Sequence, residues 1–107
     1  MSEGASYRAT SRPYVKRYGY KYRRHVFDKL RVLDLLLAEF QQLVGRGEVI
    51  AEAEDGLAEL REIVLLVEWL KPLHVVIVVD SARQEERLVT VYEPDPAVWT
   101  ADYRRRR

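Results

Sequence analysis

The sequence predicts an α+β fold in which an N-terminal helix, or two short helices, packs on an antiparallel sheet of about four strands. Apolar residues recur at spacings of three and four from Leu30 to Val44, which marks one face of a helix. After Gly47, apolar and β-branched runs alternate with turn residues, as they do in consecutive strands. Strands joined by such short connections pair antiparallel.

The predicted elements follow one another without an internal repeat. Tyr18, Tyr20 and Tyr22 alternate with other residues, and this period of two suits a strand or an extended arm. Asp55-Gly56 predicts a turn. In chain order we expect an arm at 14–25, a helix at 30–44, and strands at 48–50, 63–70, 74–80 and 87–92.

The chain of 107 residues has room for one domain. Residues 1–13 are polar and small, and we expect them to form a flexible N-terminal segment. Residues 14–103 are expected to form the single α+β domain. Residues 104–107, which are all arginine, are expected to form a basic C-terminal tail.

Composition excludes several classes of function. The chain has no cysteine, which rules out disulfides and thiolate chemistry, and a structural zinc site is not expected. We expect no cofactor. No run approaches the roughly 18 apolar residues that span a bilayer, and the first residues lack the apolar stretch of a secretory signal. The expected location is cytoplasmic, with no membrane partner.

Basic residues are concentrated at the two ends of the chain. Residues 1–31 carry a net charge of +7, residues 32–70 carry −7, residues 71–103 carry −3, and the four terminal arginines add +4. The arm at 14–25 combines its cations with tyrosines, and aromatic rings stack on bases while cations hold phosphates. The arm therefore indicates contact with RNA. An open alternative is that it pairs with the sheet, or with the acidic middle of its own chain.

Several short motifs stand in a fixed order along the chain. These are His25 at the start of the helix, then Gly47-Glu48-Val49-Ile50, Pro72-Leu73-His74-Val75-Val76, Thr90-Val91-Tyr92-Glu93-Pro94, and Trp99 before the terminal arginines. With these motifs the chain from about 25 to 107 resembles a bacterial family of domains of unknown function, placed near the RelE/ParE-like toxins.

The resemblance implies a RelE-like helix-and-sheet fold, as used by metal-independent ribonuclease toxins of type II toxin–antitoxin pairs. It implies that the substrate is RNA, either free or bound to the ribosome, and that the partner is a small zinc-finger antitoxin. Two positions depart from the family pattern. Lys29 stands where the family usually has arginine, and Leu33-Asp34 replaces a second arginine and its glycine. Lysine keeps the charge but loses the planar fork, so Arg24 or Arg31 would have to supply the missing contact.

Metal-independent RNA cleavage needs a base for the ribose 2′-OH, an acid for the leaving 5′-oxygen, and cations for the phosphate. Histidine suits the first two roles because its pKa lies near neutrality, and the chain has two histidines. We therefore expect catalytic roles for His25, His74 and Tyr92. The residues expected to bind phosphate or RNA are Arg24, Lys29, Arg31, Tyr103 and Arg104.

A non-catalytic explanation stands beside each assignment. His74 shares a strand face with Val76 and fits a hydrogen-bonded histidine at the rim of the core. His25 fits a helix-start residue, and Tyr92 fits a core aromatic with a polar tip. The alternative function is therefore a non-catalytic RNA- or protein-binding module of the same fold. A third is a structural protein whose sheet edge recruits a partner strand.

Overall fold

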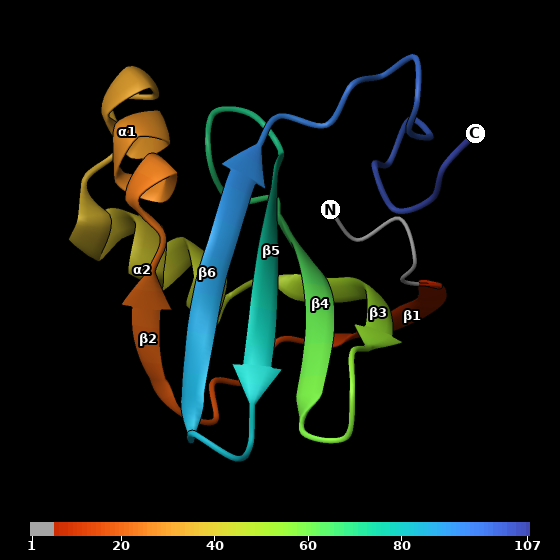
Figure 1. Ribbon diagram of the computed structural model, residues 1–107. Helices are drawn as coiled ribbons and strands as arrows, with labels where there is room; N and C mark the ends of the chain where they lie inside the picture. The colour runs from red at the N-terminus through yellow and green to blue at the C-terminus, as the bar shows by residue number, and fades with distance from the viewer. Residues whose placement is uncertain (1–5) are drawn as a thin grey trace.

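The computed structural model describes residues 6–107 and shows a six-stranded mixed sheet with two short helices on one of its faces (Figure 1). In chain order the elements are β1 (Arg8–Pro13), β2 (Gly19–Tyr22), α1 (Arg24–Val32), α2 (Leu37–Gly45), β3 (Glu48–Glu54), β4 (Glu59–Leu66), β5 (Leu73–Asp80) and β6 (Glu85–Tyr92). The strands lie in the order β1-β3-β4-β5-β6-β2.

The four central strands form an antiparallel meander, and each edge of the sheet is closed by an N-terminal strand. β3, β4, β5 and β6 pair antiparallel in sequence order. β1 adds antiparallel to β3. β2 adds parallel to β6, with Gly19 opposite Glu85 and Tyr22 opposite Leu88.

The fold predicted from the sequence, an N-terminal helix packed on a RelE-like antiparallel sheet of about four strands, is wrong. The sheet has six strands and is mixed, and two of its strands precede the first helix. The physical reason is that β1 and β2 take their hydrogen-bond partners from strands far away in the sequence. No local pattern of apolar residues encodes such pairing.

The helical stripe predicted over 30–44 is divided between two helices. α1 ends at Val32, and Asp34 adopts a φ of +57°, so the chain turns before α2 begins. Aspartate tolerates this left-handed conformation better than most residues. Both helices bury an apolar side against the same face of the sheet through Val26, Leu30, Phe40, Leu43 and Val44. Within residues 6–107 no helix is long and apolar enough to cross a membrane.

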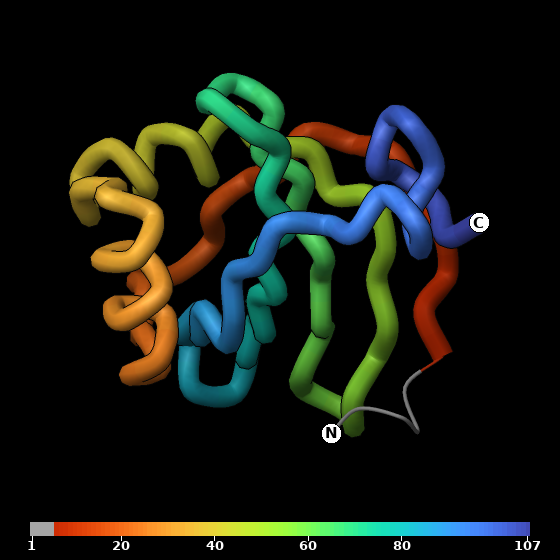
Figure 2. The backbone as a smooth tube through the Cα atoms, turned by 90° about the horizontal axis from the view of Figure 1, so that it is seen from above, coloured from red at the N-terminus to blue at the C-terminus, as the bar shows by residue number. Residues whose placement is uncertain are grey.

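A smaller core lies on the opposite face of the sheet, under the C-terminal segment at 93–107. Trp99 packs there against Ile50, Ile63, Leu65 and Val76. Figure 2 shows this segment folding back beside the strands. The terminal arginines belong to this cover, because Arg106 forms a bridge with Trp99 and Arg104 donates to Glu48.

The helix-side face of the sheet is crossed by residues 14–18, which we call the strap. The strap links β1 at one edge to β2 at the other and runs behind the sheet in Figure 1. Its Tyr14 is buried in the helix-side core, and Tyr18 packs against that core. The strap therefore covers the part of this face that the helices leave open.

Two carboxylates point into the space beneath the strap, and both are fully buried. Arg12 and Arg17 donate to Glu62 Oε2 at 3.0 and 2.8 Å. Glu86 accepts the hydroxyl of Tyr14 and the backbone N–H groups of Arg17 and Tyr18. Burial raises the pKa of Glu62, and the two arginines oppose this shift.

The expected division of the chain also changes. Residues 1–5 of the predicted flexible segment lie outside the described residues, whereas residues 8–13 form β1. Residues 104–107, the predicted tail, pack within the C-terminal segment rather than standing apart from residues 14–103.

Gly47, between α2 and β3, provides a direct test of this packing. A Cβ added there would lie 2.5 Å from Val64 Cγ1 and 3.1 Å from the Val44 carbonyl oxygen. Because Val64 is a fully buried β-branched residue, we expect Gly47→Ala to lower the free energy of unfolding by about 1–3 kcal/mol in urea denaturation. Gly45→Ala is the matched control, since a Cβ there meets nothing within 4 Å. Equal effects of the two substitutions would contradict the packing.

Candidate functional site

His74 lies at the start of β5 on the face covered by the C-terminal segment, and it is fully buried. Its Nε2 is 2.9 Å from the carbonyl oxygen of Tyr103, and its Nδ1 is 3.1 Å from the hydroxyl oxygen of Tyr92. A carbonyl only accepts, so Nε2 carries the proton and Nδ1 accepts from Tyr92. The ring also stands edge-on to Trp99, with centroids 4.5 Å apart.

The surroundings of His74 favour a neutral imidazole. Burial lowers the pKa of His74, although the bond to the Tyr103 carbonyl opposes this shift. Burial also raises the pKa of Tyr92. With both ring nitrogens bonded within the chain and no exposed surface, His74 has no atom free to exchange a proton with a substrate. The geometry is that of a cross-link between β5, β6 and the C-terminal segment.

The two histidines do not share a site. His25 is exposed on α1, which packs on the helix-side core, whereas His74 points to the opposite face. The structure thus brings together three of the predicted site residues at His74, namely His74, Tyr92 and Tyr103. It gathers four others on α1, namely Arg24, His25, Lys29 and Arg31.

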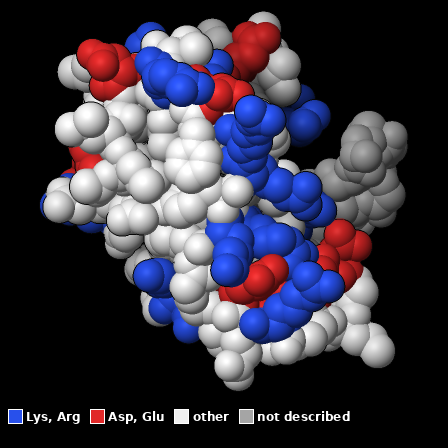
Figure 3. All heavy atoms as spheres, turned by 60° about the vertical axis from the view of Figure 1, so that its left-hand side comes forward, with Lys and Arg blue, Asp and Glu red and all other residues white. Residues whose placement is uncertain are grey.

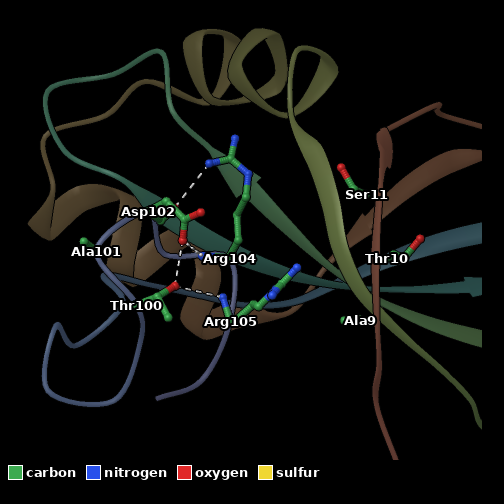
Figure 4. Close-up of a pocket in the computed structure, with 8 residues that line it drawn as sticks. All are labelled: Ala9, Thr10, Ser11, Thr100, Ala101, Asp102, Arg104 and Arg105. Atoms are coloured by element: carbon green, nitrogen blue, oxygen red, sulfur yellow. Dashed lines mark hydrogen bonds between the residues drawn. The ribbon is translucent and has the colours of Figure 1, made fainter.

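Arg104 is paired with a carboxylate of its own chain. Its guanidinium donates to both carboxylate oxygens of Glu48, with the shortest bond at 2.7 Å. Arg104 thereby holds the pKa of Glu48 below its ordinary value. Next to this pair lies a groove of about 720 Å³ between β1 and the C-terminal segment (Figure 4).

Several polar groups that line this groove are already hydrogen-bonded within the chain. Thr100 donates to Asp102 at 2.6 Å and accepts the backbone N–H of Arg105. Ser11 donates to Glu48. The side chains of Thr100, Asp102, Ser11 and Arg104 are therefore held in place by their own chain.

Most cations of β1 and the strap are also paired within the chain. Arg8 and Arg12 bond to Glu52, and Arg12 and Arg17 bond to Glu62. Arg12 lowers the pKa of Glu52. For the predicted arm at 14–25 the alternative of pairing within the chain applies to Arg17, which bonds to Glu62, and to residues 19–22, which pair with β6.

The side of the molecule formed by β2 and α1 is different. Lys21, Arg23, Arg24 and Lys29 have no carboxylate within 4.0 Å among residues 6–107. Figure 3 turns this side forward and shows lysine and arginine side chains gathered in a band. We call Lys21, Arg23, Arg24, His25 and Lys29 the basic face.

Backbone geometry adds positive potential to the basic face. α1 begins at Arg24 with no acidic residue in its first turn, and the preceding Arg23 makes no side-chain capping bond. The first N–H groups of a helix have no intrahelical acceptor, so they carry the positive end of the helix dipole. The start of α1 and its flanking cations therefore favour an anion.

A pair of aromatic rings lies on the same two elements as these cations, with Tyr22 on β2 and Phe27 on α1. The rings of Tyr22 and Phe27 are 5.2 Å apart, and Phe27 is 43% exposed. Tyr22 also accepts a hydrogen bond from Gln41 at 2.7 Å, which fixes its ring between β2 and α2. An exposed ring beside unpaired cations is the combination that binds single-stranded nucleic acid.

Sequence reasoning chose Arg24, Lys29 and Arg31 but did not single out Lys21 or Arg23. The signal was present in the alternation of the arm, because the tyrosines of β2 turn inward and Lys21 turns outward. Arg31 differs from the basic face, since it pairs with Asp28.

The environment of His74 predicts a pH effect on stability. Because the folded pKa lies below the ordinary value of 6.5, His74 contributes stability above that pH, and the contribution is lost as pH falls. We expect His74→Phe to lower the free energy of unfolding at pH 8 by about 1–3 kcal/mol, since Tyr92 and Tyr103 lose their partner. The variant should also lose less stability than the wild type between pH 7 and 5.

Urea denaturation followed by tryptophan fluorescence measures both effects. His25→Gln is the control and should behave as the wild type, because His25 is exposed. An equally steep loss of stability in His74→Phe and the wild type would contradict a buried neutral imidazole.

Comparison with known proteins leaves this site without an assignment by similarity. The resemblance built on Pro72-Leu73-His74-Val75-Val76 accordingly stays a prediction, and function has to be inferred from the geometry. No family model, no curated protein and no solved structure matches the chain.

Proposed function

We propose that this protein is a non-catalytic RNA-binding module that holds single-stranded RNA on its basic face. One observation carries the proposal. Lys21 of β2, the preceding residue Arg23, and Arg24 and Lys29 of α1 have no carboxylate partner within residues 6–107, whereas Arg8, Arg12, Arg17 and Arg104 are paired with carboxylates of the sheet. Unpaired cations beside an exposed aromatic ring form a surface suited to a flexible polyanion.

Each part of the basic face has a distinct role in this proposal. Lys21, Arg23 and Arg24 would neutralise successive phosphates, supported by the free N–H groups at the start of α1. Phe27 would stack on a base, which every base permits because each has a flat π-face. The expected binding is therefore tolerant of sequence and weakened by salt.

A metal-independent ribonuclease toxin, neutralised by a zinc-finger antitoxin, is the second candidate. It is favoured by one observation, the exposed imidazole of His25 between cations. His25 and Lys29 are one helical turn apart and so share a side of α1, and Arg24 precedes His25. In this version His25 takes the proton of the ribose 2′-OH, and Arg24 and Lys29 stabilise the charged phosphate.

Binding of a short fluorescein-labelled RNA, measured by anisotropy over a salt series, tests the first candidate. We expect the double variant Lys21→Gln with Arg24→Gln to bind RNA more weakly. It should also reduce the slope of log K against log salt by about 1.4, roughly 0.7 for each lost phosphate contact. Arg46→Gln removes one exposed cation elsewhere and should leave the slope unchanged. Equal losses in both variants, or no binding by the wild type, would refute the proposed interface.

Incubation of end-labelled RNA with the protein and EDTA separates the two candidates. We expect the wild type to leave the RNA intact under conditions in which it binds. Cleavage that falls about 100-fold in His25→Gln, the scale of a general acid or base, would instead establish the ribonuclease. His74→Phe serves as the control for a purely structural histidine.

A further inference from the structure

Exposed apolar side chains gather where the turn between α1 and α2 meets the loop between β4 and β5. Figure 2 shows these two segments next to each other, and residues of both line one shallow groove. Val32 and Leu36 flank the turn, and Val67 and Leu70 belong to the loop. Leu36 is 75% exposed and Leu70 is 86% exposed. Of these four residues Leu70 lines the groove, and we call the groove together with the four exposed side chains of the two segments the apolar corner.

The groove at the apolar corner is lined by three apolar and three acidic residues. Leu33 and Trp69 line it while packing against the helix-side core, which fixes their positions. The groove has a volume of about 460 Å³. Asp34, Glu39 and Glu68 also line it, and we call these three the rim carboxylates, so an occupant meets both apolar and carboxylate side chains.

The rim carboxylates are poorly neutralised by their own chain. Asp34 and Glu39 form no ion pair within the part of the chain that the structure describes, and Glu68 lies 3.8 Å from Arg46, on an exposed side chain. Exposed pairs at such distances contribute little. The corner therefore presents a net negative potential around an uncovered apolar surface.

From this complementarity we infer that the apolar corner docks an amphipathic helix of a partner protein, in which lysine or arginine flanks the apolar stripe. Leucine-sized side chains one turn apart would enter the groove between the turn and the loop, as in helix-in-groove recognition. The flanking cations would meet Asp34, Glu39 and Glu68.

Three other occupants fit the charges less well. A second copy of this chain, docked through the same corner, would place the three carboxylates against their own copies, because a two-fold interface is self-complementary. An anionic lipid surface would be repelled by the same rim. RNA would be repelled as well, and its proposed place is the basic face, so the two surfaces can be occupied together.

Titration of the full chain with two synthetic peptides tests the inference. Both peptides carry the same leucine stripe in a helical sequence, and they differ only in having lysine or glutamate beside it. The indole N–H signal of Trp69 reports on the groove, and Trp99, on the opposite face, serves as the internal reference. We expect the lysine peptide to shift the Trp69 signal and to bind at least tenfold more tightly than the glutamate peptide.

Matched substitutions locate the contact. Leu70→Gln should weaken binding of the lysine peptide about tenfold, the scale of one central interface residue. Leu57→Gln, in the turn between β3 and β4, replaces an even more exposed leucine away from the corner and should have no effect. Both side chains are solvent-exposed, so neither change threatens folding.

Three results would overturn the inference: no binding of the lysine peptide, equal binding of the two peptides, or equal losses in Leu70→Gln and Leu57→Gln. Binding of RNA by Leu70→Gln should match the wild type. A loss of RNA binding in that variant would show that the corner belongs to the RNA surface and not to a protein partner.

Discussion

Two buried carboxylates on the helix-side face of the sheet, Glu62 and Glu86, determine the course of the N-terminal segment. A buried carboxylate without partners would destabilise the fold by several kcal/mol. Here the strap supplies those partners through Tyr14, Arg17 and the backbone of Tyr18, and β1 adds Arg12. Because these groups have to reach both acids, the chain crosses the whole sheet between its first two strands.

This network of buried carboxylates and their partners fixes the path of the strap more than it raises the free energy of unfolding. Burial still raises the pKa of Glu62 in the presence of two arginines, and its buried Oε1 has no hydrogen-bond partner among residues 6–107. Buried ion pairs often stabilise no better than apolar residues of the same volume, but removing one partner is costly. The acids thus tie the strap to one path, and that path places β1 and β2 at opposite edges.

The same pairing divides the surface into regions of different chemistry. Glu48, Glu52 and Glu62 pair with Arg8, Arg12, Arg17 and Arg104. Two surfaces lie outside this network. One is the basic face on β2 and α1, and the other is the apolar corner with its carboxylates, between the two helices and the β4–β5 loop. A net charge of +1 conceals this separation, which only the pairing pattern reveals.

Most of the centre of the sheet could be predicted from the sequence, and its edges could not; the central strand expected at 63–70 is β4 at Glu59–Leu66, four residues earlier. The strand expected at 74–80 is β5, and the turn expected at Asp55-Gly56 joins β3 to β4, with Gly56 at a φ of +83°. Those elements depend on local residue patterns. β2 depends on a parallel partner at 85–88, and the break between the helices depends on one aspartate in a left-handed conformation.

The candidate site shows a similar division. The apolar spacing predicted a helix only from Leu30, and Arg24 and His25 were expected in the arm at 14–25, whereas α1 begins at Arg24 and carries Arg24, His25 and Lys29. The burial of His74 does not follow from its strand, because alternation tells which residues share a face but not which face the C-terminal segment covers. The partner of His74 is the backbone carbonyl of Tyr103, a residue with a φ of +63°, and no pattern of side chains in the sequence predicts such a backbone partner.

The path of the strap also has a consequence for biosynthesis. A chain leaves the ribosome from its N-terminus, yet β1 pairs with β3, and β2 pairs with β6, the last strand to be made. The meander from β3 to β6 is contiguous and can assemble from neighbouring hairpins, whereas the strap cannot dock until Glu86 has emerged. The first two strands therefore acquire their partners late: Arg8 and Arg12 of β1 lack theirs until Glu52 of β3 and Glu62 of β4 have been made, and the strap lacks Glu86 until β6 has been made.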